Sequence, residues 1–162
     1  DDVDLGPLVS LSARNEVHEM VVSSLKMGAK LELGGKIPNF KGAYYPITVI
    51  TKVNPGMPIF DEEVFGPVFS IVEATDDDHA INLANNCKYG LGAAIFTSNI
   101  NEGKKIAYER LQAGICFVND YVKSDPRLPF GGVKMSGYGR ELSSYGLIEF
   151  VNIKSIVISD IN

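Results

Sequence analysis

The sequence predicts an α/β fold in which a parallel sheet is flanked by helices. Residues 68–119 alternate apolar runs with helix-like segments, in the order strand, helix, strand, helix, strand. The runs at 68–74, 92–97 and 115–119 are rich in apolar residues, as strands covered on both faces are. Parallel neighbours need a crossover connection, usually a helix, and such crossovers are right-handed, so this alternation indicates a parallel sheet.

The residues before this region predict one helix and two strands. Ser10 or Ser12 can cap a helix that runs to Lys26 and is stopped by Gly28. Its apolar residues recur three and four positions apart: Val17, Met20, Val21 and Leu25. The strands are KLEL and the β-branched run YYPITVIT, separated by the turn-rich GGKIPNFKG.

Two helices are predicted between the three apolar runs. The first begins at three aspartates, residues 76–78, because negative charge is favourable at a helix N-terminus, and it ends at Tyr89 and Gly90. Its inner face is expected to hold Ala80, Ile81, Leu83 and Ala84. The second begins at Asn99 or Asn101 and is closed by Gly114. Its stripe is Ile100, Gly103, Ala107 and Leu111, with Ile106 beside it.

A further strand is predicted in the last part of the chain, EFVNIKSIVIS, which has no later partner in the sequence. An unpaired strand with apolar residues on both faces invites aggregation unless something covers it. Pairing with another subunit explains it most simply, and pairing with a further part of the same protein is the alternative. We therefore expect two parts, residues 1–147 and an oligomerisation segment at 148–162, and a homo-oligomer.

Composition narrows the class of protein. Hydrophobic residues make up 45% and charged residues 22%, and the formal net charge is −5. No apolar run approaches the roughly 20 residues of a membrane helix. The basic residues are scattered, which argues against nucleic acid or an anionic membrane as a partner. We expect a cytoplasmic protein that acts on a small molecule.

Cysteines and histidines predict no metal site. Cys87 and Cys116 lack metal-ligand spacing, and His18 and His79 lie far apart on helix-like segments. We interpret the cysteines as small packing residues and the histidines as solvated ones. The chain begins with Asp1 and shows no signal peptide, and we read it as a piece of a longer protein.

Several strings in a fixed order resemble the aldehyde dehydrogenase superfamily. They are EEVFGPV, YGLGAAIFT, RLQAGICFVN and LPFGGVKMSGYGRE, and with the opening helix and closing strand they cover essentially all 162 residues. The resemblance is to about the C-terminal third of such enzymes. It implies that the nucleophilic cysteine, the general base and the Rossmann-like cofactor domain lie upstream, so this piece alone is expected to be inactive. It also implies NAD or NADP as cofactor, without deciding between them.

The resemblance implies that Glu63 binds the nicotinamide ribose and that Phe65 lies against the nicotinamide ring. A carboxylate has two acceptor oxygens, which suit the two hydroxyl donors of a ribose diol. Gly66 then allows close backbone approach. The alternative is a solvated acidic loop, because three acids lie together at residues 61–63.

Substrate contacts are expected in the loop NDYVKSDPRLPFGG. The resemblance implies that this loop lines the aldehyde tunnel and that Phe130 forms an aromatic wall of it. The sequence of the loop is most similar to that of bacterial and archaeal succinate semialdehyde dehydrogenases. Ser124 matches the serine that donates a hydrogen bond to the distal carboxylate of that substrate. Arg127 is either a carboxylate clamp or a partner of Asp125 or Asp120 that fixes the loop.

The string LELGGK matches the family motif that contains the general base, but it stands in the wrong place. The family motif follows the Rossmann unit and precedes the nucleophilic cysteine. Here the string follows the first helix and leads into YYPITVIT. Glu32 is therefore predicted to be a surface residue beside a short strand, and not a catalytic base.

Overall fold

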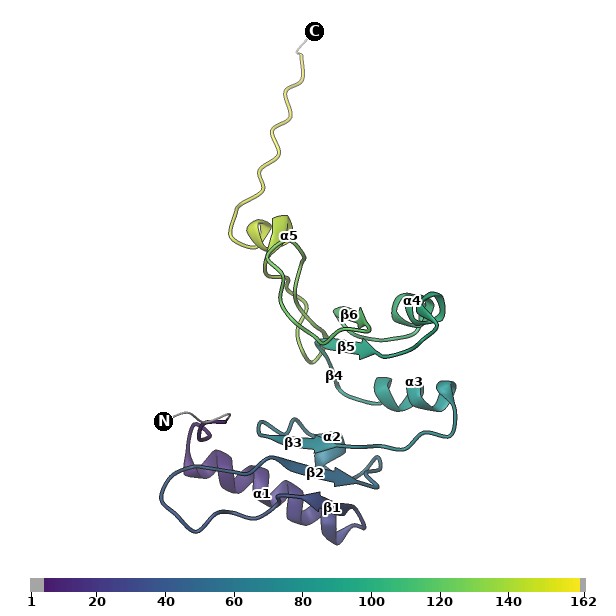
Figure 1. The fold of residues 1–162 in the computed structure, drawn as a ribbon. Helices are drawn as coiled ribbons and strands as arrows, with labels where there is room; N and C mark the ends of the chain where they lie inside the picture. The colour runs from purple at the N-terminus through teal and green to yellow at the C-terminus, as the bar shows by residue number, and fades with distance from the viewer. Residues whose placement is uncertain (1–4, 161–162) are drawn as a thin grey trace. The chain divides into compact units, whose positions relative to one another are not determined.

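The computed structural model describes residues 5–160, which divide into two compact units with the boundary between Cys87 and Lys88 (Figure 1). Residues 1–4 and 161–162, the two ends of the expected parts, lie outside the described residues. The proposed division at residue 147 stays a prediction. Each unit is described by itself.

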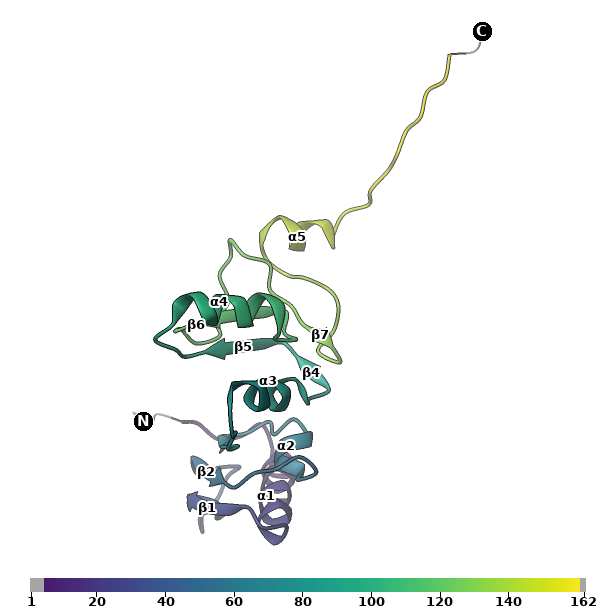
Figure 2. The same cartoon turned by 90° about the vertical axis from the view of Figure 1, so that its right-hand side faces the viewer.

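The first unit consists of a helix packed on a small mixed sheet. Helix α1 (Leu11–Lys26) precedes strand β1 (Lys30–Leu33), which pairs antiparallel with β2 (Thr48–Thr51). Strand β3 (Val68–Ser70) pairs parallel with β2, and the short helix α2 (Pro58–Asp61) lies in the connection between them. Figures 1 and 2 both show α1 running beside this sheet.

The predicted cap and inner face of α1 are confirmed. The Ser10 hydroxyl accepts a hydrogen bond of 3.1 Å from the Ala13 N–H, so Ser10 caps the helix. Ser12 donates to Glu16 instead. The buried residues of the helix are Val17, Val21 and Ser24. The serine in this stripe was not expected to have a role, and it has one in the candidate site.

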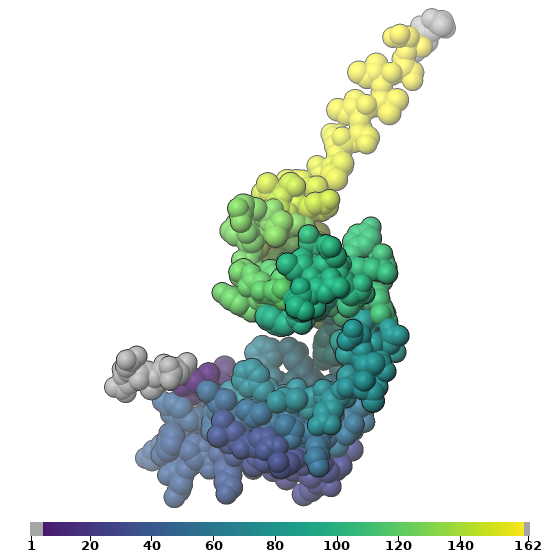
Figure 3. Space-filling view, turned by 45° about the vertical axis from the view of Figure 1, so that its right-hand side comes forward, coloured from purple at the N-terminus to yellow at the C-terminus, as the bar shows by residue number. Residues whose placement is uncertain are grey.

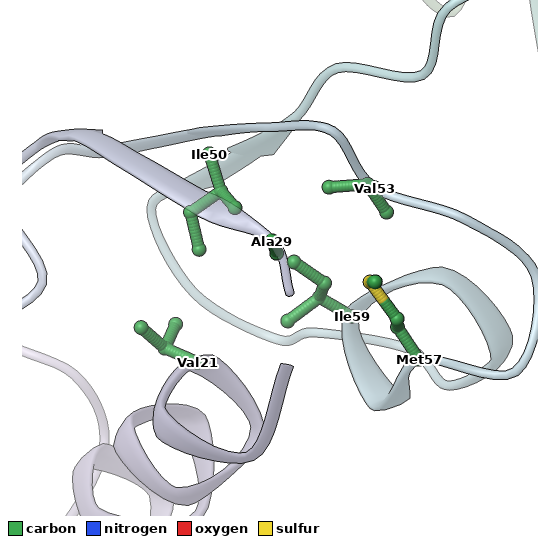
Figure 4. Close-up of a cluster of buried hydrophobic side chains, with 6 residues drawn as sticks. All are labelled: Val21, Ala29, Ile50, Val53, Met57 and Ile59. Atoms are coloured by element: carbon green, nitrogen blue, oxygen red, sulfur yellow. The ribbon is translucent and has the colours of Figure 1, made fainter. Parts of the chain in front are cut away.

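A single hydrophobic cluster holds the first unit together (Figure 4). It is formed by α1, β2, α2 and the connecting segments through Val21, Ala29, Ile50, Val53, Met57 and Ile59. Ile50 and Val21 are 0% exposed. Because close-packed side chains transmit displacement, the segments that meet here hold one another in place.

Helix α3 (Asp77–Asn85) completes the first unit and corrects one prediction. Asp76 caps it, since its carboxylate accepts a 2.8 Å hydrogen bond from the His79 N–H. The helix ends at Asn85, and Tyr89–Gly90 form strand β4 of the second unit. The sequence prediction that these two residues end the helix is wrong, because they pair with another strand. Of the expected inner face only Ile81 is buried.

The second unit contains two small sheets. Strand β5 (Gly92–Ile95) and β6 (Ile115–Val118) run parallel and are joined by helix α4 (Ile100–Glu109), as Figure 2 shows. Strand β4 pairs antiparallel with β7 (Val133–Lys134). Asn99 caps α4, as one of the two predicted alternatives. The helix ends before Gly114, which starts the return to β6.

The prediction of a parallel sheet over residues 68–119 is confirmed for its second and third strands and not for its first. The order strand, helix, strand, helix, strand is confirmed, and so is the parallel pairing of β5 with β6. Strand β3, however, pairs with β2 in the first unit. The connection that contains the short helix α2 brings these two strands side by side. The β-branched run at 44–51 predicts a strand but does not indicate its partner.

The segment beyond helix α5 (Ser143–Ile148) is extended and exposed (Figure 3). Residues 152–160 form no strand with any other described part of the chain. A strand is defined by hydrogen bonds to a neighbour. The predicted oligomerisation strand therefore stays a prediction.

Candidate functional site

The acidic loop, residues 61–67, runs from the last residue of α2 to β3 and carries the two residues expected to bind a cofactor. Glu63 is exposed, and Phe65 is 79% exposed. The backbone beneath them is tightly turned. The Gly66 N–H donates to the Val64 carbonyl and the Val68 N–H donates to the Gly66 carbonyl, both at 2.8 Å.

Gly66 lets this loop lie directly on helix α1. A Cβ added to Gly66 would stand 2.9 Å from a methyl group of Val17. A larger residue would therefore lift the loop from the helix, or displace the side chain of Val17. The backbone is pressed onto the first unit while Glu63 and Phe65 remain open to solvent.

The three acids of the loop differ in what they already bind. The Asp61 carboxylate accepts a 3.2 Å hydrogen bond from the Gly56 N–H, and Glu62 also takes part in an interaction. The Glu63 carboxylate forms no hydrogen bond or ion pair with any residue between 5 and 160. Among these acids Glu63 is the one whose acceptor oxygens are available to a ligand.

Two serines fix the helix that precedes the acidic loop. Met57, at the N-cap of α2, provides no side-chain cap. The Ser24 hydroxyl of α1 accepts from the Ile59 N–H instead, at 3.2 Å, and the Ser70 hydroxyl donates to the Ile59 carbonyl at 3.2 Å. Sequence reasoning missed this arrangement. Its signal was a serine at a fully buried position of an otherwise apolar helix stripe.

A long loop, residues 119–132, carries the residues expected to contact substrate. Ser124 is exposed, and Phe130 is half-buried. The backbone of Phe130 exchanges two hydrogen bonds with Glu141, at 2.9 and 2.8 Å. Phe130 also lines a cavity of about 400 Å³. The other residues around this cavity include Leu91, Ser136, Arg140, Glu141 and Phe150.

The charges of the long loop are paired with one another. Arg127 binds Asp125 through two side-chain hydrogen bonds of 2.9 and 2.6 Å. This guanidinium holds the pKa of Asp125 well below its usual range. Lys123 binds Asp120 at 2.6 Å and lies over the Tyr121 ring. Of the two readings of Arg127, the structure shows the loop-fixing pair.

The expected residues fall into two pairs. Glu63 and Phe65 share the acidic loop of the first unit, and Ser124 and Phe130 share the long loop of the second. Within each pair the two side chains are held by one backbone segment. Their ligand contacts stay predictions.

The cysteines and histidines have structural roles. Cys116 lies in β6, and burial raises the pKa of its thiol, which disfavours the thiolate. Cys87 is half-buried beside a cavity of about 380 Å³. His18 bonds the Tyr45 hydroxyl at 3.1 Å, and His79 accepts from the N–H of Thr75. Between residues 5 and 160, no three potential metal ligands gather and no helix is long and apolar enough to span a bilayer.

Glu32 lies on the surface strand β1, at a bulge in its pairing with β2. Its carboxylate accepts from the Thr51 hydroxyl at 2.7 Å and pairs with Lys30 at 2.9 Å. The Thr51 hydrogen bond, followed by Lys30, lowers the pKa of Glu32, whereas a general base works best with a pKa near the working pH. The next glycines, Gly34 and Gly35, have φ of 71° and 73° and form the turn after the strand.

These features together define a class of protein. The chain is an α/β scaffold with parallel strand pairs, and it presents an available carboxylate and an exposed aromatic ring on one loop, and a hydroxyl and a second ring on another. The family assignment follows from comparison with known proteins. Residues 1–156 match the model of the aldehyde dehydrogenase family, and the chain belongs to that family.

Curated relatives and a solved structure extend this result. The chain is 47% identical over 152 residues to the succinate semialdehyde dehydrogenase [NAD(P)+] of Escherichia coli K12, covering 94% of this chain and 33% of that protein. It is 44% identical over 158 residues to the succinate-semialdehyde dehydrogenase [NADP(+)] of Mycobacterium leprae, covering 98% and 34%. The crystal structure of succinic semialdehyde dehydrogenase from Streptococcus pyogenes with NADP+ is similar, with a TM-score of 0.91 and 39% identity, covering 98% and 35%. The chain thus spans about a third of the length of these relatives.

Proposed function

We propose that these residues form part of the catalytic domain of a cytosolic NAD(P)-dependent aldehyde dehydrogenase that oxidises succinate semialdehyde to its carboxylic acid. The observation that carries this proposal is the 47% identity to an enzyme named for that substrate and for NAD(P)+. The chain covers 33% of that enzyme, and we use the term intact enzyme for the longer protein to which we assign it.

Glu63 and Phe65 are suited to a nicotinamide cofactor, which supplies a hydride acceptor when bound. The Glu63 carboxylate has no partner among residues 5–160, so both oxygens can accept hydrogen bonds from ribose hydroxyls. Phe65 offers a largely exposed ring that a planar group can cover. Gly66 lets the loop that carries both residues stay seated on α1, because a Cβ there would meet the side chain of Val17.

The long loop is suited to an aldehyde with a carboxylate at its far end. Its two acids, Asp120 and Asp125, are neutralised by Lys123 and Arg127. A negatively charged substrate therefore meets no uncompensated charge there. Ser124 lies between these pairs and can donate its hydroxyl to the carboxylate. Phe130 provides an apolar wall for the carbon chain.

The family resemblance assigns the remaining chemistry to other parts of the intact enzyme. They supply the thiolate that attacks the aldehyde and the base that activates water for release of the acid. The 162 residues alone are expected to be inactive. Production of reduced cofactor from succinate semialdehyde by the purified chain would contradict this expectation.

Replacing Glu63 in the intact enzyme tests the cofactor role. E63Q keeps the shape and removes the charge, and hydrogen bonds to charged groups are the stronger ones, so we expect KM for the cofactor to rise about tenfold. KM for the aldehyde is expected to change little. E62Q is the matched control, because Glu62 already takes part in an interaction. Equal effects of E62Q and E63Q would overturn the assignment.

Replacing Ser124 tests the substrate class. S124A removes the proposed hydrogen bond to the distal carboxylate, so kcat/KM for succinate semialdehyde is expected to fall about tenfold. Activity on butanal, which has the same chain length without the carboxylate, is expected to be unchanged. A parallel loss with both aldehydes would contradict the role of Ser124.

A second candidate function is self-association, and the exposed C-terminal segment favours it. Phe150 is 89% exposed, Ile153 82%, Val157 87% and Ile158 88%. Extended apolar segments gain free energy by adding to the edge of another sheet. We expect light scattering to report an oligomer for the whole chain and a monomer after deletion of residues 149–162. A monomer in both cases would exclude this role.

A further inference from the structure

We infer that Asn119 is a positioning residue that sets the direction in which the long loop leaves the sheet. This inference rests on the proposed function of that loop as the substrate contact. Asn119 directly follows Val118, the last residue of β6. Its φ is 58°, in the left-handed region that few residues other than glycine occupy. Asparagine tolerates this conformation better than most side chains do.

The side chain of Asn119 binds the backbone of Thr97, just beyond the end of β5. Its Nδ2 donates to the Thr97 carbonyl and its Oδ1 accepts from the Thr97 N–H, both at 2.8 Å. Two facing residues exchange such a pair of bonds through their backbones only in antiparallel sheets, whereas β5 and β6 are parallel, so the carboxamide caps Thr97 in a way that the backbone of this strand pair would not. The partners also define the orientation of the carboxamide, because the Thr97 carbonyl only accepts and its N–H only donates.

This arrangement ends the strand pair at a defined point and frees the backbone to turn. The Asn119 N–H still donates to the Ile95 carbonyl at 2.7 Å, the last backbone bond of the β5–β6 pair. Beyond it, Thr97 is satisfied by the carboxamide. The backbone of Asp120 is therefore released from the sheet in a direction that the left-handed residue determines.

Before it returns at Phe130, the loop contacts β5 through Val122, whose side chain lies where a Cβ on Gly92 would stand. The ion pairs of residues 120–127 are local and join neighbours in sequence. One long-range tie is the 3.0 Å hydrogen bond from the Ser143 N–H to the Pro126 carbonyl. The return is held by the bridge between Phe130 and Glu141. Asn119 fixes how the loop starts, and Val122 and Pro126 then hold it on either side of Ser124.

Three substitutions separate the effect of the left-handed backbone of Asn119 from the effect of its side-chain hydrogen bonds. N119G tolerates the positive φ and removes both side-chain hydrogen bonds. N119A removes both bonds and also strains the backbone. N119D keeps the acceptor for the Thr97 N–H but places a carboxylate oxygen against the Thr97 carbonyl. If the inference holds, N119A has the largest effect, and N119G shows the effect of the hydrogen bonds alone.

The test compares two aldehydes in the intact enzyme. We expect N119G to lower the preference for succinate semialdehyde over butanal about tenfold, with KM for NAD(P) within about twofold of the wild type. N99A is the matched control, because it removes an asparagine side chain that caps α4 in the same unit without touching the long loop. N99A is expected to leave the preference unchanged. An equal loss of activity on both aldehydes with N119G would show a merely structural role and overturn the inference.

A further pair of measurements distinguishes this inference from the proposed function. The double variant N119G/S124A is expected to be no less selective than S124A, because Asn119 acts through Ser124. If S124A leaves selectivity unchanged, the role of Ser124 fails, and amide hydrogen exchange measured on the intact enzyme then tests the positioning role by itself. N119G must then speed exchange in residues 120–129 while N99A does not. Equal exchange in the two variants would overturn the positioning role as well.

Discussion

The two units differ in what they bury. All buried hydrophobic residues of the described chain, from Val17 to Ile81, lie in the first unit. In the second unit the buried residues of the described chain are glycines: Gly90, Gly103, Gly132 and Gly146. The first unit is held by interlocking side chains, and the second by close approach of backbone segments. Packing of side chains stabilises chiefly by removing apolar area from water, whereas close backbone approach depends on the absence of a Cβ.

The same contrast separates the two ligand loops. The acidic loop is held by groups distant in sequence, since Val17 supports Gly66 and Ser24 holds Ile59. The long loop is held by Asn119 at its start, by ion pairs between its own residues, and by backbone hydrogen bonds to residues 141 and 143 near its end. Changes to the first unit should therefore act through lost packing. Changes to the second should act through clashes or through local polar contacts.

The largest loss of folding stability is expected from truncating a buried side chain in the core of the first unit. Ile50 is fully buried in the cluster shown in Figure 4. I50A is expected to lower the free energy of unfolding by about 2–5 kcal/mol, through lost burial and a cavity. I50V, the matched control, should cost about 0.5–1.5 kcal/mol. Denaturant unfolding measures both, and equal effects would show that this position is not closely packed.

The next largest loss of folding stability is expected from adding one methyl group to a glycine of the second unit. A Cβ at Gly114 would overlap the Gly131 carbonyl oxygen, which belongs to the backbone and cannot rotate away. G114A is therefore expected to destabilise the unit by about 1–3 kcal/mol. G139A is the control, because a Cβ at Gly139 would meet nothing within 4 Å. Comparable unfolding midpoints for the two variants would contradict the conclusion that the second unit depends on close backbone approach.

Local features of both units could be predicted from the sequence. The helix caps Ser10, Asp76 and Asn99 bond to N–H groups three residues ahead, so short-range patterns reveal them. The order of strands and helices was predictable for the same reason. The Glu63 loop and the long loop were found through the family resemblance, which also identified the misplaced LELGGK string.

Long-range partners could not be predicted. The pairing of β2 with β3 depends on which strands the core brings together. Ser24 holds Ile59 from a helix far upstream, and Asn119 binds the backbone of Thr97. A serine in a helix or an asparagine after a strand has many local uses, so its type alone does not name its partner.

A smaller effect is expected from the ion pair of the long loop, and it depends on pH. The Arg127 hydrogen bonds lower the pKa of Asp125 in the folded chain below its usual value of about 3.9. The pair therefore stabilises the loop at pH values above the unfolded pKa, and this stabilisation is lost as pH falls towards the folded value. NMR titration of the Asp125 carboxyl should show the lowered pKa, and R127Q should return it towards the usual value. Titration at the ordinary value in the wild type would show that the pair does not persist in solution.

The smallest effect on activity is expected from replacing Glu32, although its sequence context most resembles a catalytic motif. Its carboxylate is bound to Thr51 and Lys30 on an exposed strand, and that binding lowers its pKa. E32Q keeps an acceptor for the Thr51 hydroxyl, so kcat and its pH profile in the intact enzyme should be unchanged. Removal of a true general base would lower kcat by about 10²-fold or more. Such a loss would identify Glu32 as the base and would contradict the division of roles in which the first unit contributes the cofactor contact alone.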